Sequence, residues 1–456
     1  MAAVWDSVAD YVHSLGLDAY LVGGAVRDEL LGKTPRELDF VVPGVGHAEL
    51  RAALEPHGKV EDLVVADQQV GVRLLPRDKT ARALQPSGIE FTPPRVERST
   101  GPGRHDFEIV ADKEISLEQD MERRDFTINA IARRLETGEI LDPLGGRADL
   151  ERGVLRTTGP TSFRDDPLRI VRGLRFVSQL DVDPDEDTLR QMREWAPRIE
   201  HVSGERIGGG LASDGMGELS KLLLGEHPAK ALGLARGAGV LLHLLPEFEP
   251  TIGYVQQSDR QHLPLDEHIF VVVQAASDAD APLEVRLAAL LHDLGKPEAE
   301  REGGDHAAIG AGVASQALAR LRYPSRLREY VVRVVREHSF VQDGEPAPVD
   351  ARRFVARHGE RLAFDLLAHR AADLTGKTPP QSEWDWLGRF RTLVERERAQ
   401  PHRLADLAVD GADLIAAGFV EGPELGRALQ TLLGEVVEDP RRNSREQLLS
   451  RARELV

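Results

Sequence analysis

The chain has 456 residues, of which 41% are hydrophobic and 29% charged, so it is long enough for two to four domains with buried cores. It contains no cysteine, which excludes disulfides and thiolate metal sites and favours an intracellular protein. The formal net charge of −18 argues against a uniformly basic surface, although nucleic-acid binding depends on local patches. The chain has no long unbroken apolar run and no basic N-terminal segment before an apolar one, so we expect neither a membrane span nor a secretory signal.

The first segment with a chemical signature lies at residues 20–32. Apolar residues run into Gly23 and Gly24, a helical run follows and ends at Gly32, and a second apolar run begins after it. This order predicts a strand, a tight turn, a helix and a second strand, after an opening amphipathic helix over residues 1–19. Glycines allow a ligand to approach the backbone, and Arg27 in the first helical turn offers a guanidinium that suits phosphate. A Gly-Gly turn before a helix is also common without any function.

Two acids follow on the second predicted strand. Glu37 and Asp39 are two residues apart and share one face, while Leu38 and Phe40 point the other way. Carboxylates that lie side by side repel each other unless a cation lies between them, and Mg²⁺ prefers such hard oxygen ligands. The alternative interpretation is a solvated strand face.

The sequence LVGGAVRD at residues 21–28, followed by Glu37 and Asp39, resembles the head of the class II tRNA nucleotidyltransferases (CCA-adding enzymes) and bacterial poly(A) polymerases, which belong to the DNA polymerase β-like superfamily. Glu37 stands where an Asp is usual in that family. The resemblance implies an α/β nucleotidyltransferase head in which Glu37 and Asp39 are catalytic and bind Mg²⁺. It also implies that the nucleotide is bound by Gly23, Gly24 and Arg27.

Strand-like runs continue from residue 60 to residue 91, where Glu90 projects opposite to Ile89 and Phe91. The resemblance places a third catalytic carboxylate at Glu90, whereas the residues alone are equally compatible with a solvent-facing strand acid. Residues 93–106 are rich in Pro, Gly and charge, which predicts a mobile loop. Enzymes of the family carry a flexible loop here that helps to select the incoming nucleotide.

A capping-box pattern from Ser116 to Gln119 predicts a helix that continues through Ala130. Asp125 and Asn129 are four residues apart and would share one face of that helix. The run RRDFTIN at residues 123–129 resembles the second motif of the family, which handles the ribose hydroxyls and the triphosphate. The resemblance implies nucleotide binding by Arg124, Asp125 and Asn129. Without it, the arginines indicate a solvated helix face.

A further helix is predicted after residue 166. Pro167 suits the first helical position, which makes Asp166 a natural N-cap, and Asp166, Arg169 and Arg172 fall on one polar arc. The segment resembles the EDxxR-type motif of the family, with Asp165 for the usual Glu, in which an Asp and an Arg contact the Watson–Crick edge of CTP or ATP. The resemblance implies nucleotide binding by Asp166, Arg169, Arg172 and Arg175. Capping alone remains an alternative for Asp166.

Histidines and acids recur in the second half of the chain. Adjacent His292 and Asp293 follow an apolar run, and a shared divalent ion would provide a partner for both if they are buried. The pattern resembles the HD-domain phosphohydrolase superfamily. The resemblance implies a metal site made of His268, His292, Asp293 and Asp373, with room for a second metal at His306 and His338. The ion would be Mg²⁺ or a transition metal of the Mn, Ni, Fe or Co type, and any single histidine could instead be a core or surface residue.

The sequence therefore predicts four parts: an α/β nucleotidyltransferase head at 1–150, an all-helical neck and body that binds nucleotide and RNA at 151–255, a helical HD domain at 256–395 and a helical tail at 396–456. The predicted function is template-independent addition of C, A or both from CTP and ATP to the 3′ end of tRNA, with release of pyrophosphate. The resemblance also allows an associated phosphohydrolase activity of the HD domain. We expect a cytoplasmic protein without an obligatory protein partner. An HD phosphohydrolase with a nucleotide-binding but inactive head is the alternative, and a non-catalytic RNA-binding protein is a third. The motifs do not distinguish CCA, CC, A and poly(A) addition.

Overall fold

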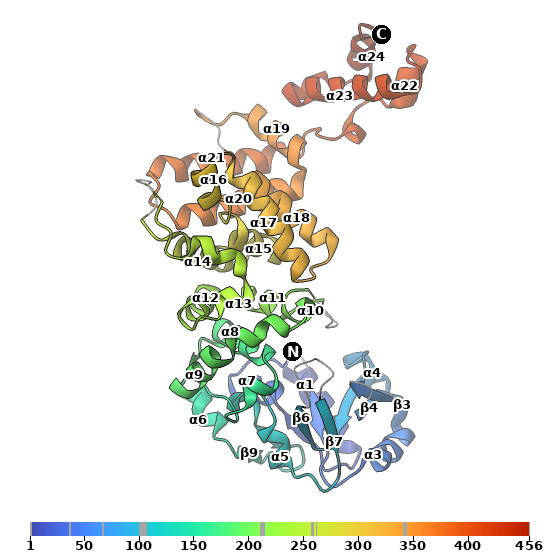
Figure 1. Ribbon diagram of the computed structural model, residues 1–456. Coiled ribbons are helices and arrows are strands. Elements are labelled where there is room, and N and C mark those ends of the chain that lie inside the picture. The colour runs from blue at the N-terminus through green and yellow to red at the C-terminus, as the bar shows by residue number, and fades with distance from the viewer. Residues whose placement is uncertain are drawn as a thin grey trace. The chain divides into compact units, whose positions relative to one another are not determined.

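The computed structural model describes residues 2–35, 38–65, 68–99, 107–209, 215–256, 260, 262–340 and 344–455. The chain divides into two compact units (Figure 1). The first is formed by Met1–Pro246 with Arg320–Tyr323, and the second by Glu247–Ala319 with Pro324–Val456. In the part of the chain that is described, no helix is both long enough and apolar enough to cross a membrane.

A seven-stranded mixed sheet is the framework of the first unit, with the order β3-β4-β5-β2-β1-β8-β9. Strands β2 and β5 run parallel, and the other neighbours in this sheet are antiparallel. The strands are β1 (Tyr20–Val22), β2 (Asp39–Val41), β3 (Gly58–Val65), β4 (Gln68–Pro76), β5 (Ile89–Thr92), β8 (Ala132–Arg134) and β9 (Ile140–Leu141). The predicted α/β head is therefore confirmed.

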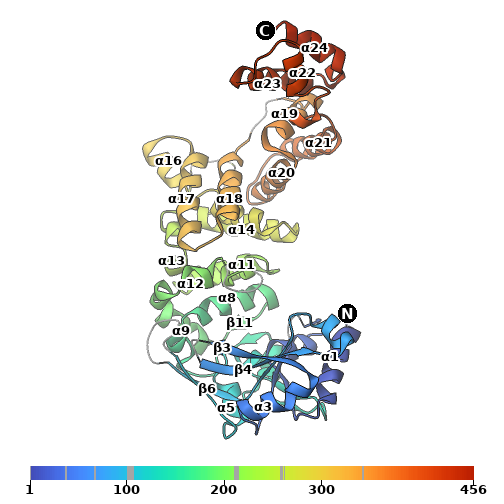
Figure 2. The same cartoon turned by 90° about the vertical axis from the view of Figure 1, so that its right-hand side faces the viewer.

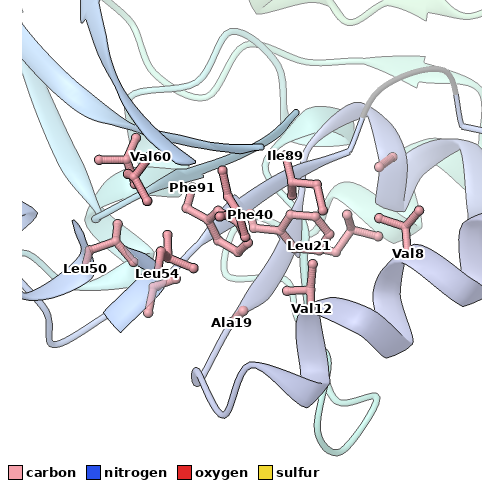
Figure 3. Close-up of a cluster of buried hydrophobic side chains, with 14 of the residues drawn as sticks. Val8, Val12, Ala19, Leu21, Phe40, Leu50, Leu54, Val60, Ile89 and Phe91 are labelled. Carbon is pink, nitrogen blue, oxygen red and sulfur yellow. The ribbon is translucent and has the colours of Figure 1, made fainter. Parts of the chain in front are cut away.

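One face of this sheet carries the hydrophobic core of the head (Figure 3). Leu21, Phe40 and Phe91 come from neighbouring strands and are almost fully buried, and the two Phe rings stack with centroids 5.6 Å apart. Helices α1 (Ala2–Ser14) and α3 (His47–Leu54) cover this face with pairs of apolar residues spaced by four, such as Leu50 and Leu54. Because side chains alternate along a strand, the residues next to Phe40 and Phe91 point to the opposite face.

A short helix and a two-stranded ribbon complete the strand part of the head. Helix α2 (Gly24–Leu30) follows β1 directly, as predicted. Strands β6 (Arg95–Ser99) and β7 (Phe107–Ala111) pair in antiparallel register. The predicted mobile loop at 93–106 is therefore wrong for residues 95–99, where hydrogen bonds to β7 form a ladder, and residues 100–106 lie outside the described part of the chain.

The segment with the RRDFTIN run is not one continuous helix. Helix α5 (Leu117–Glu122) opens with the predicted capping box at Ser116 but ends at Glu122, and Thr127–Asn129 form a single 3-10 turn. The backbone of Phe126 is extended and bridges to Thr157, while the Thr127 amide donates to the carbonyl of Arg156. These long-range backbone bonds replace the helical ones, so the prediction of a helix through Ala130 was wrong.

The rest of the first unit is helical apart from a two-residue parallel pair, β10 (Val154–Leu155) with β11 (Asp183–Pro184). Helix α8 (Leu168–Leu180) runs through its centre and buries Ile170, Val171 and Leu174. The surrounding helices are α6 (Gly146–Glu151), α7 (Ser162–Asp165), α9 (Glu186–Trp195), α10 (Gly204–Ile207), α11 (Glu218–Leu223), α12 (Pro228–Gly237) and α13 (Leu241–Leu244).

The glycines that follow α10 are explained by a close backbone contact. Gly209 donates its amide to the carbonyl of Leu321, and a Cβ at Gly209 would lie 2.6 Å from the carbonyl oxygen of Arg322. Gly209 also bridges to Met216, so the chain turns back between α10 and α11. A side chain at this position would push away the turn at residues 320–323, which belongs to the same compact unit.

The second unit is a helical bundle followed by a small helical tail. Helix α15 contacts α14, α18 and α20 (Figure 1), and α20 also contacts α14 and α18, which Figure 2 labels from another side. The bundle contains α14 (Leu265–Asp278), α15 (Leu283–Leu291), α16 (Lys296–Glu302), α17 (His306–Arg320), α18 (Ser325–Glu337), α19 (Pro348–His358), α20 (Glu360–Thr375) and α21 (Gln381–Glu397). The tail contains α22 (Gly411–Ala416), α23 (Pro423–Glu438) and α24 (Arg445–Arg453).

The tail has its own apolar cluster around Leu414, Leu432 and Leu448. Arg352 of α19 connects it to the bundle, because its guanidinium donates to the backbone carbonyls of Val437 and Glu438. These hydrogen bonds hold the tail against α19 of the bundle.

Candidate functional site

A row of charged residues crosses the face of the head sheet opposite the hydrophobic core. Asp39 of β2 is in register with Glu90 of β5, and Glu90 is in register with Arg73 of β4. Registered neighbours project from the same face of a sheet and lie about 5 Å apart. Asp39 and Glu90 therefore lie side by side, as the predicted metal site requires, whereas Glu37 lies outside the described residues. Arg73 donates to Glu90 at 3.2 and 2.5 Å.

The glycine turn lies at the end of this row. Val22, the last residue of β1, is in register with Asp39, and Gly23 follows it. Gly23 has a φ of 70°, and a Cβ there would lie 2.7 Å from Nη1 of Arg124. Glycine is thus required both by the backbone conformation and by the close approach of a guanidinium. The glycine turn therefore lies between Arg124, which it approaches closely, and the strand position that pairs with Asp39.

Arg27 of α2 is tied to the second motif. Its Nη1 donates to Oδ1 of Asn129 at 2.7 Å, and its Nε and Nη2 donate to Asp28. Asn129 in turn donates to Asp125 at 3.0 Å, which confirms the predicted proximity of Asp125 and Asn129 although no helix joins them. These contacts hold Arg27 in the first turn of α2, next to the glycine turn.

Buried Asp120 holds both arginines of the second motif and was missed by sequence reasoning. Its carboxylate accepts hydrogen bonds from Arg123 at 2.9 and 2.8 Å and from Arg124 at 3.0 Å, and it is fully buried. Burial raises the pKa of Asp120, but the two guanidinium charges outweigh burial and the pKa is lowered overall. The signal available in the sequence was the spacing, since Asp120 precedes the arginines by three and four residues.

Arg172 of α8 links the head to the helical body. It donates to Oδ2 of Asp125 at 2.9 and 2.7 Å and lies 3.4 Å from Glu218 of α11. Burial raises the pKa of Asp125, but the Arg172 charge and the Asn129 hydrogen bond outweigh it and keep that pKa well below its usual range. Arg175 lies 3.2 Å from the other oxygen of Glu218, and burial lowers the pKa of Arg175 to about 10.

Glu218 therefore fixes two of the predicted nucleotide-binding arginines, although nothing in its local sequence pointed to that position. The arginines also surround one aromatic ring. The guanidinium carbons of Arg27, Arg172 and Arg175 lie 5.1, 5.9 and 4.4 Å from the ring centre of Phe176. Such stacking orients guanidinium groups and concentrates positive charge at one place.

Asp166 and Arg169 are both used in contacts within the protein. Asp166 accepts the Leu168 amide at 3.1 Å with one oxygen and Arg206 at 3.0 Å with the other. The N-cap of α8 is Pro167, one residue later than predicted, although one oxygen of Asp166 still accepts an amide of the first helical turn. Arg169 donates to the backbone carbonyls of Arg123 and Arg124 at 2.8 and 3.2 Å, so it attaches α8 to the second motif.

A second cluster lies inside the helical bundle. The carboxylate of Asp293 lies 3.4 Å from Nε2 of His268 and 3.0 Å from Nε2 of His292, and Asp373 lies 3.3 and 3.7 Å from the same nitrogens. All four side chains are at most 2% exposed. The structure thus brings together the four residues predicted for one metal site.

The donor atoms of this cluster fit a divalent ion. Nε2 of His268 and of His292 and Oδ1 of Asp373 are buried and, among the described residues, have no hydrogen-bond partner. The opposite ring nitrogens contact the backbone carbonyls of Gly376 and Ala289 at 3.0 and 2.9 Å. A histidine that donates through Nδ1 directs the lone pair of Nε2 to the cluster, which is the arrangement of a metal ligand.

Asp293 also faces the two histidines predicted for a second metal. Its Oδ1 lies 3.8 Å from Nε2 of His306 and 3.7 Å from Nε2 of His338, while its Oδ2 faces the first pair. One carboxylate with an oxygen toward each histidine pair can bridge two ions. Sequence reasoning missed His369, which is fully buried, one helical turn before Asp373, with neither ring nitrogen hydrogen-bonded in the described part of the chain.

The comparisons with protein families match three consecutive parts of the chain. Residues 19–156 match a poly A polymerase head domain. Residues 181–252 match a probable RNA- and SrmB-binding site of polymerase A, and residues 265–415 match an HD domain. The fold and these three matches define the class of the protein: a nucleotidyltransferase head joined to a helical body and an HD domain.

Related proteins extend this match to most of the chain. A "multifunctional CCA protein" of Nitrosococcus oceani is 36% identical over 72% of this chain and 76% of its own length. One from Methylococcus capsulatus is 32% identical over 91% of this chain and 93% of its own. The solved structure of the Bacillus stearothermophilus CCA-adding enzyme in complex with CTP aligns with a TM-score of 0.70 and 26% identity, covering 98% of this chain and 95% of that one. The chain belongs to the CCA-adding tRNA nucleotidyltransferase family.

Proposed function

We propose that this chain adds C and A residues to the 3′ end of tRNA from CTP and ATP, using the carboxylate row of the head as its catalytic centre. In this reaction a 3′-hydroxyl of the RNA attacks the α-phosphate of the nucleotide, the α–β phosphoanhydride bond breaks and pyrophosphate leaves. The observation that carries the proposal is the register of Asp39 with Glu90 on neighbouring strands, with Asp39 also in register with Val22, the residue before Gly23.

The metal would be held by Asp39, Glu90 and Glu37. Two carboxylates on neighbouring strands are hard oxygen donors suited to Mg²⁺. When bound, Mg²⁺ supplies charge neutralisation at the triphosphate and lowers the pKa of the attacking hydroxyl. Arg73 keeps Glu90 in place on the side away from Asp39.

The nucleotide would be held by arginines from the head and the body. Arg27 and Arg124 lie against the glycine turn and would bind the triphosphate. Asp125 and Asn129 offer hydrogen-bonding groups for a ribose hydroxyl. The nucleoside would be bound by Asp166, Arg169, Arg172 and Arg175, so that the protein would select the base.

Each part of the chain would have its own role in this reaction. The head at 1–150 would carry the chemistry, and the body at 151–255 would hold the nucleoside and the acceptor end of tRNA. The parts at 256–395 and 396–456 would form the HD domain and a supporting tail. Solved structures of CCA-adding enzymes in complex with ATP and with tRNA support these partners. We also propose that the reaction takes place in the cytoplasm.

A second activity is favoured by the cluster in the helical bundle. The unpartnered donor atoms of His268, His292 and Asp373 support a divalent transition metal or Mg²⁺ there. When bound, such an ion supplies an activated water for hydrolysis of a phosphate ester. In that reaction the water oxygen bonds to phosphorus and the ester P–O bond breaks, which releases an alcohol and phosphate.

The two activities can be separated with paired variants. Purified wild type, Asp39→Ala and Asp293→Ala are incubated with tRNA transcripts that end before C, before CC and before A, each with a single NTP. We expect Asp39→Ala to lose incorporation and Asp293→Ala to keep it. Wild type that incorporates no nucleotide but hydrolyses phosphate esters would overturn the main proposal in favour of an HD phosphohydrolase with an inactive head.

Glu90, the third predicted carboxylate, has a matched control in Glu61 of the same sheet. Glu90 and Glu61 both neighbour Arg73 in strand register, but Glu61 lies on the side away from Asp39. Glu90→Gln should lower incorporation strongly, whereas Glu61→Gln should not. Equal activity of the two variants would remove Glu90 from the catalytic centre.

A further inference from the structure

A cation, Arg73 of β4, stands next to the two carboxylates of the head sheet. Arg73 is in register with Glu90, which is in register with Asp39, so Arg73 lies two strands, or about 10 Å, from Asp39. Its Nε and Nη2 both donate to one oxygen of Glu90, Oε1, at 3.2 and 2.5 Å. Because neither bond uses Oε2, Glu90 can contact Arg73 and a cation on its other side at the same time.

The sheet is shaped to hold this arginine. Gly88, just before β5, has a φ of 93°, and a Cβ there would lie 2.7 Å from Cγ and 2.9 Å from Cδ of Arg73. A glycine at this position therefore leaves room for the aliphatic part of Arg73 to lie across the neighbouring chain. The Arg73 side chain is still 37% exposed, so it can be reached by a ligand from solvent.

The acids beside Arg73 leave its charge available to an anion. Glu61 of β3 is in register with Arg73 on the side away from Glu90, but it accepts a hydrogen bond from Lys59 at 2.7 Å, which compensates its charge. The Arg73–Glu90 pair is 37% and 39% exposed, and ion pairs that exposed contribute little, so Arg73 can change its partner at low cost. Once Glu90 also serves a divalent ion together with Asp39, its charge is shared and the guanidinium can bind another anion.

The chemistry of the proposed reaction indicates which anion this is. In phosphoryl transfer the attacking and leaving oxygens lie roughly in line, on opposite sides of the phosphorus. The leaving pyrophosphate belongs to the triphosphate, which the proposed function places at Gly23, directly after β1. The strand order β4-β5-β2-β1 puts Arg73 on the other side of the two carboxylates. The attacking 3′ end of the RNA therefore approaches from the side of Arg73, and the phosphate of its last linkage comes with it.

We propose that Arg73 binds the phosphodiester at the 3′-terminal linkage of the RNA substrate and so positions the attacking hydroxyl beside Asp39 and Glu90. The inference rests on the proposed nucleotide addition and names a contact of its RNA substrate. A phosphodiester has one negative charge and two free oxygens, which suit the planar fork of a guanidinium. Arg73 thus contacts the RNA, whereas the arginines near the glycine turn contact the triphosphate.

The test combines a change in the protein with a change in the RNA. A tRNA that lacks its terminal CCA is prepared with an uncharged methylphosphonate at its last internucleotide linkage, or at a linkage in the middle of the acceptor stem as control. Its binding to full-length protein is measured by filter retention with Mg²⁺ but without nucleotide, so that no bond is formed. Arg73→Met is compared with Arg77→Met, which removes an equal charge just after the same strand, where Arg77 donates to the carbonyl of Pro56. KM for tRNA and KM for CTP are measured on the same proteins.

We expect the terminal methylphosphonate to weaken binding about two- to tenfold for wild type and Arg77→Met, the effect of one partly exposed charge pair. It should not weaken binding to Arg73→Met, because the guanidinium that contacts this phosphate is already missing. The methylphosphonate in the acceptor stem should affect all three proteins equally. Arg73→Met should raise KM for tRNA by a similar factor and leave KM for CTP unchanged. Circular dichroism checks that the variant folds, and Arg73→Gln replaces it in the same measurements if it does not.

Three results would overturn the inference alone, provided that wild type incorporates nucleotide. The first is an equal effect of the terminal methylphosphonate on Arg73→Met and Arg77→Met, and the second is the absence of any effect on wild type. The third is a lower kcat of Arg73→Met with the tRNA KM of wild type, which would make Arg73 only a positioning residue for Glu90. Wild type that incorporates no nucleotide would overturn the proposed function, and the inference with it.

Discussion

Gly23→Ala tests whether the glycine turn positions the triphosphate arginine. Gly23 combines a φ of 70° with a ψ of −130°, a conformation that costs a residue with a side chain about 1–3 kcal/mol. The added Cβ would also lie 2.7 Å from Nη1 of Arg124, so the guanidinium must move. Loss of one charge-assisted hydrogen bond to the nucleotide corresponds to a decrease of about ten- to a hundredfold in kcat/KM for CTP.

Gly32→Ala is the matched control for this prediction. Gly32 has a φ of 67°, but no atom lies within 4 Å of a Cβ built there, so the substitution adds backbone strain without displacing an arginine. Both variants should unfold at lower denaturant concentration than wild type, and only Gly23→Ala should lose CTP incorporation measured on folded protein. Equal kcat/KM for the two variants would refute the argument that Gly23 is required for the position of Arg124.

Three further substitutions test residues that hold other groups in place. Glu218→Gln should raise KM for both CTP and ATP, because Arg172 and Arg175 lose the carboxylate that fixes them. Initial rates of incorporation measure KM, and a raised KM for one nucleotide alone would contradict the prediction. Asp120→Asn should lower the free energy of unfolding by about 3–5 kcal/mol, since it removes the fully buried carboxylate that pairs with both Arg123 and Arg124. Because the folded-state pKa of Asp120 is lowered, this difference should be constant above the ordinary carboxyl pKa and shrink as the pH falls through the folded-state pKa. His369→Ala should lower the bound Mn²⁺ per chain, measured by elemental analysis, and an unchanged metal content would remove His369 from the site.

The predicted loss of Mn²⁺ in His369→Ala has a control in His243. His243 contacts Glu200 at 2.8 Å and is 31% exposed, so His243→Ala removes an imidazole that no buried cluster uses. Its metal content should equal that of wild type. A similar loss in both histidine variants would indicate a general loss of folded protein.

The parts of the fold that could be predicted from sequence were those set by local chemistry. Alternating apolar residues and the Gly23 turn predicted β1, α2 and β2, because strand alternation and backbone freedom are local properties. The helix after Ser116 was predicted to start in the right place but to end too late. Its end depends on backbone bonds from Phe126 and Thr127 to a segment some thirty residues away, which no local pattern reveals.

The candidate site also contains residues that local sequence could reveal and residues that it could not. The ligands near His292 could be predicted because adjacent His and Asp at a helix end are chemically distinctive. Glu218 and His369 were missed because each acts through a partner brought close by tertiary packing. Asp120 differs from them, because its partners Arg123 and Arg124 are three and four residues away and the spacing alone could have revealed it. Glu218, for example, is separated from Arg172 by 46 positions, and its contact depends on the packing of α11 against α8.

The central claim is that Asp39 and Glu90 hold a divalent ion next to a triphosphate at the glycine turn. Its most direct test is an anomalous difference map from crystals of the wild-type protein grown with Mn²⁺ and CTP. We predict a peak within coordination distance of carboxylate oxygens of both Asp39 and Glu90, with the triphosphate beside Gly23. A peak bound to CTP but away from both carboxylates would contradict the account.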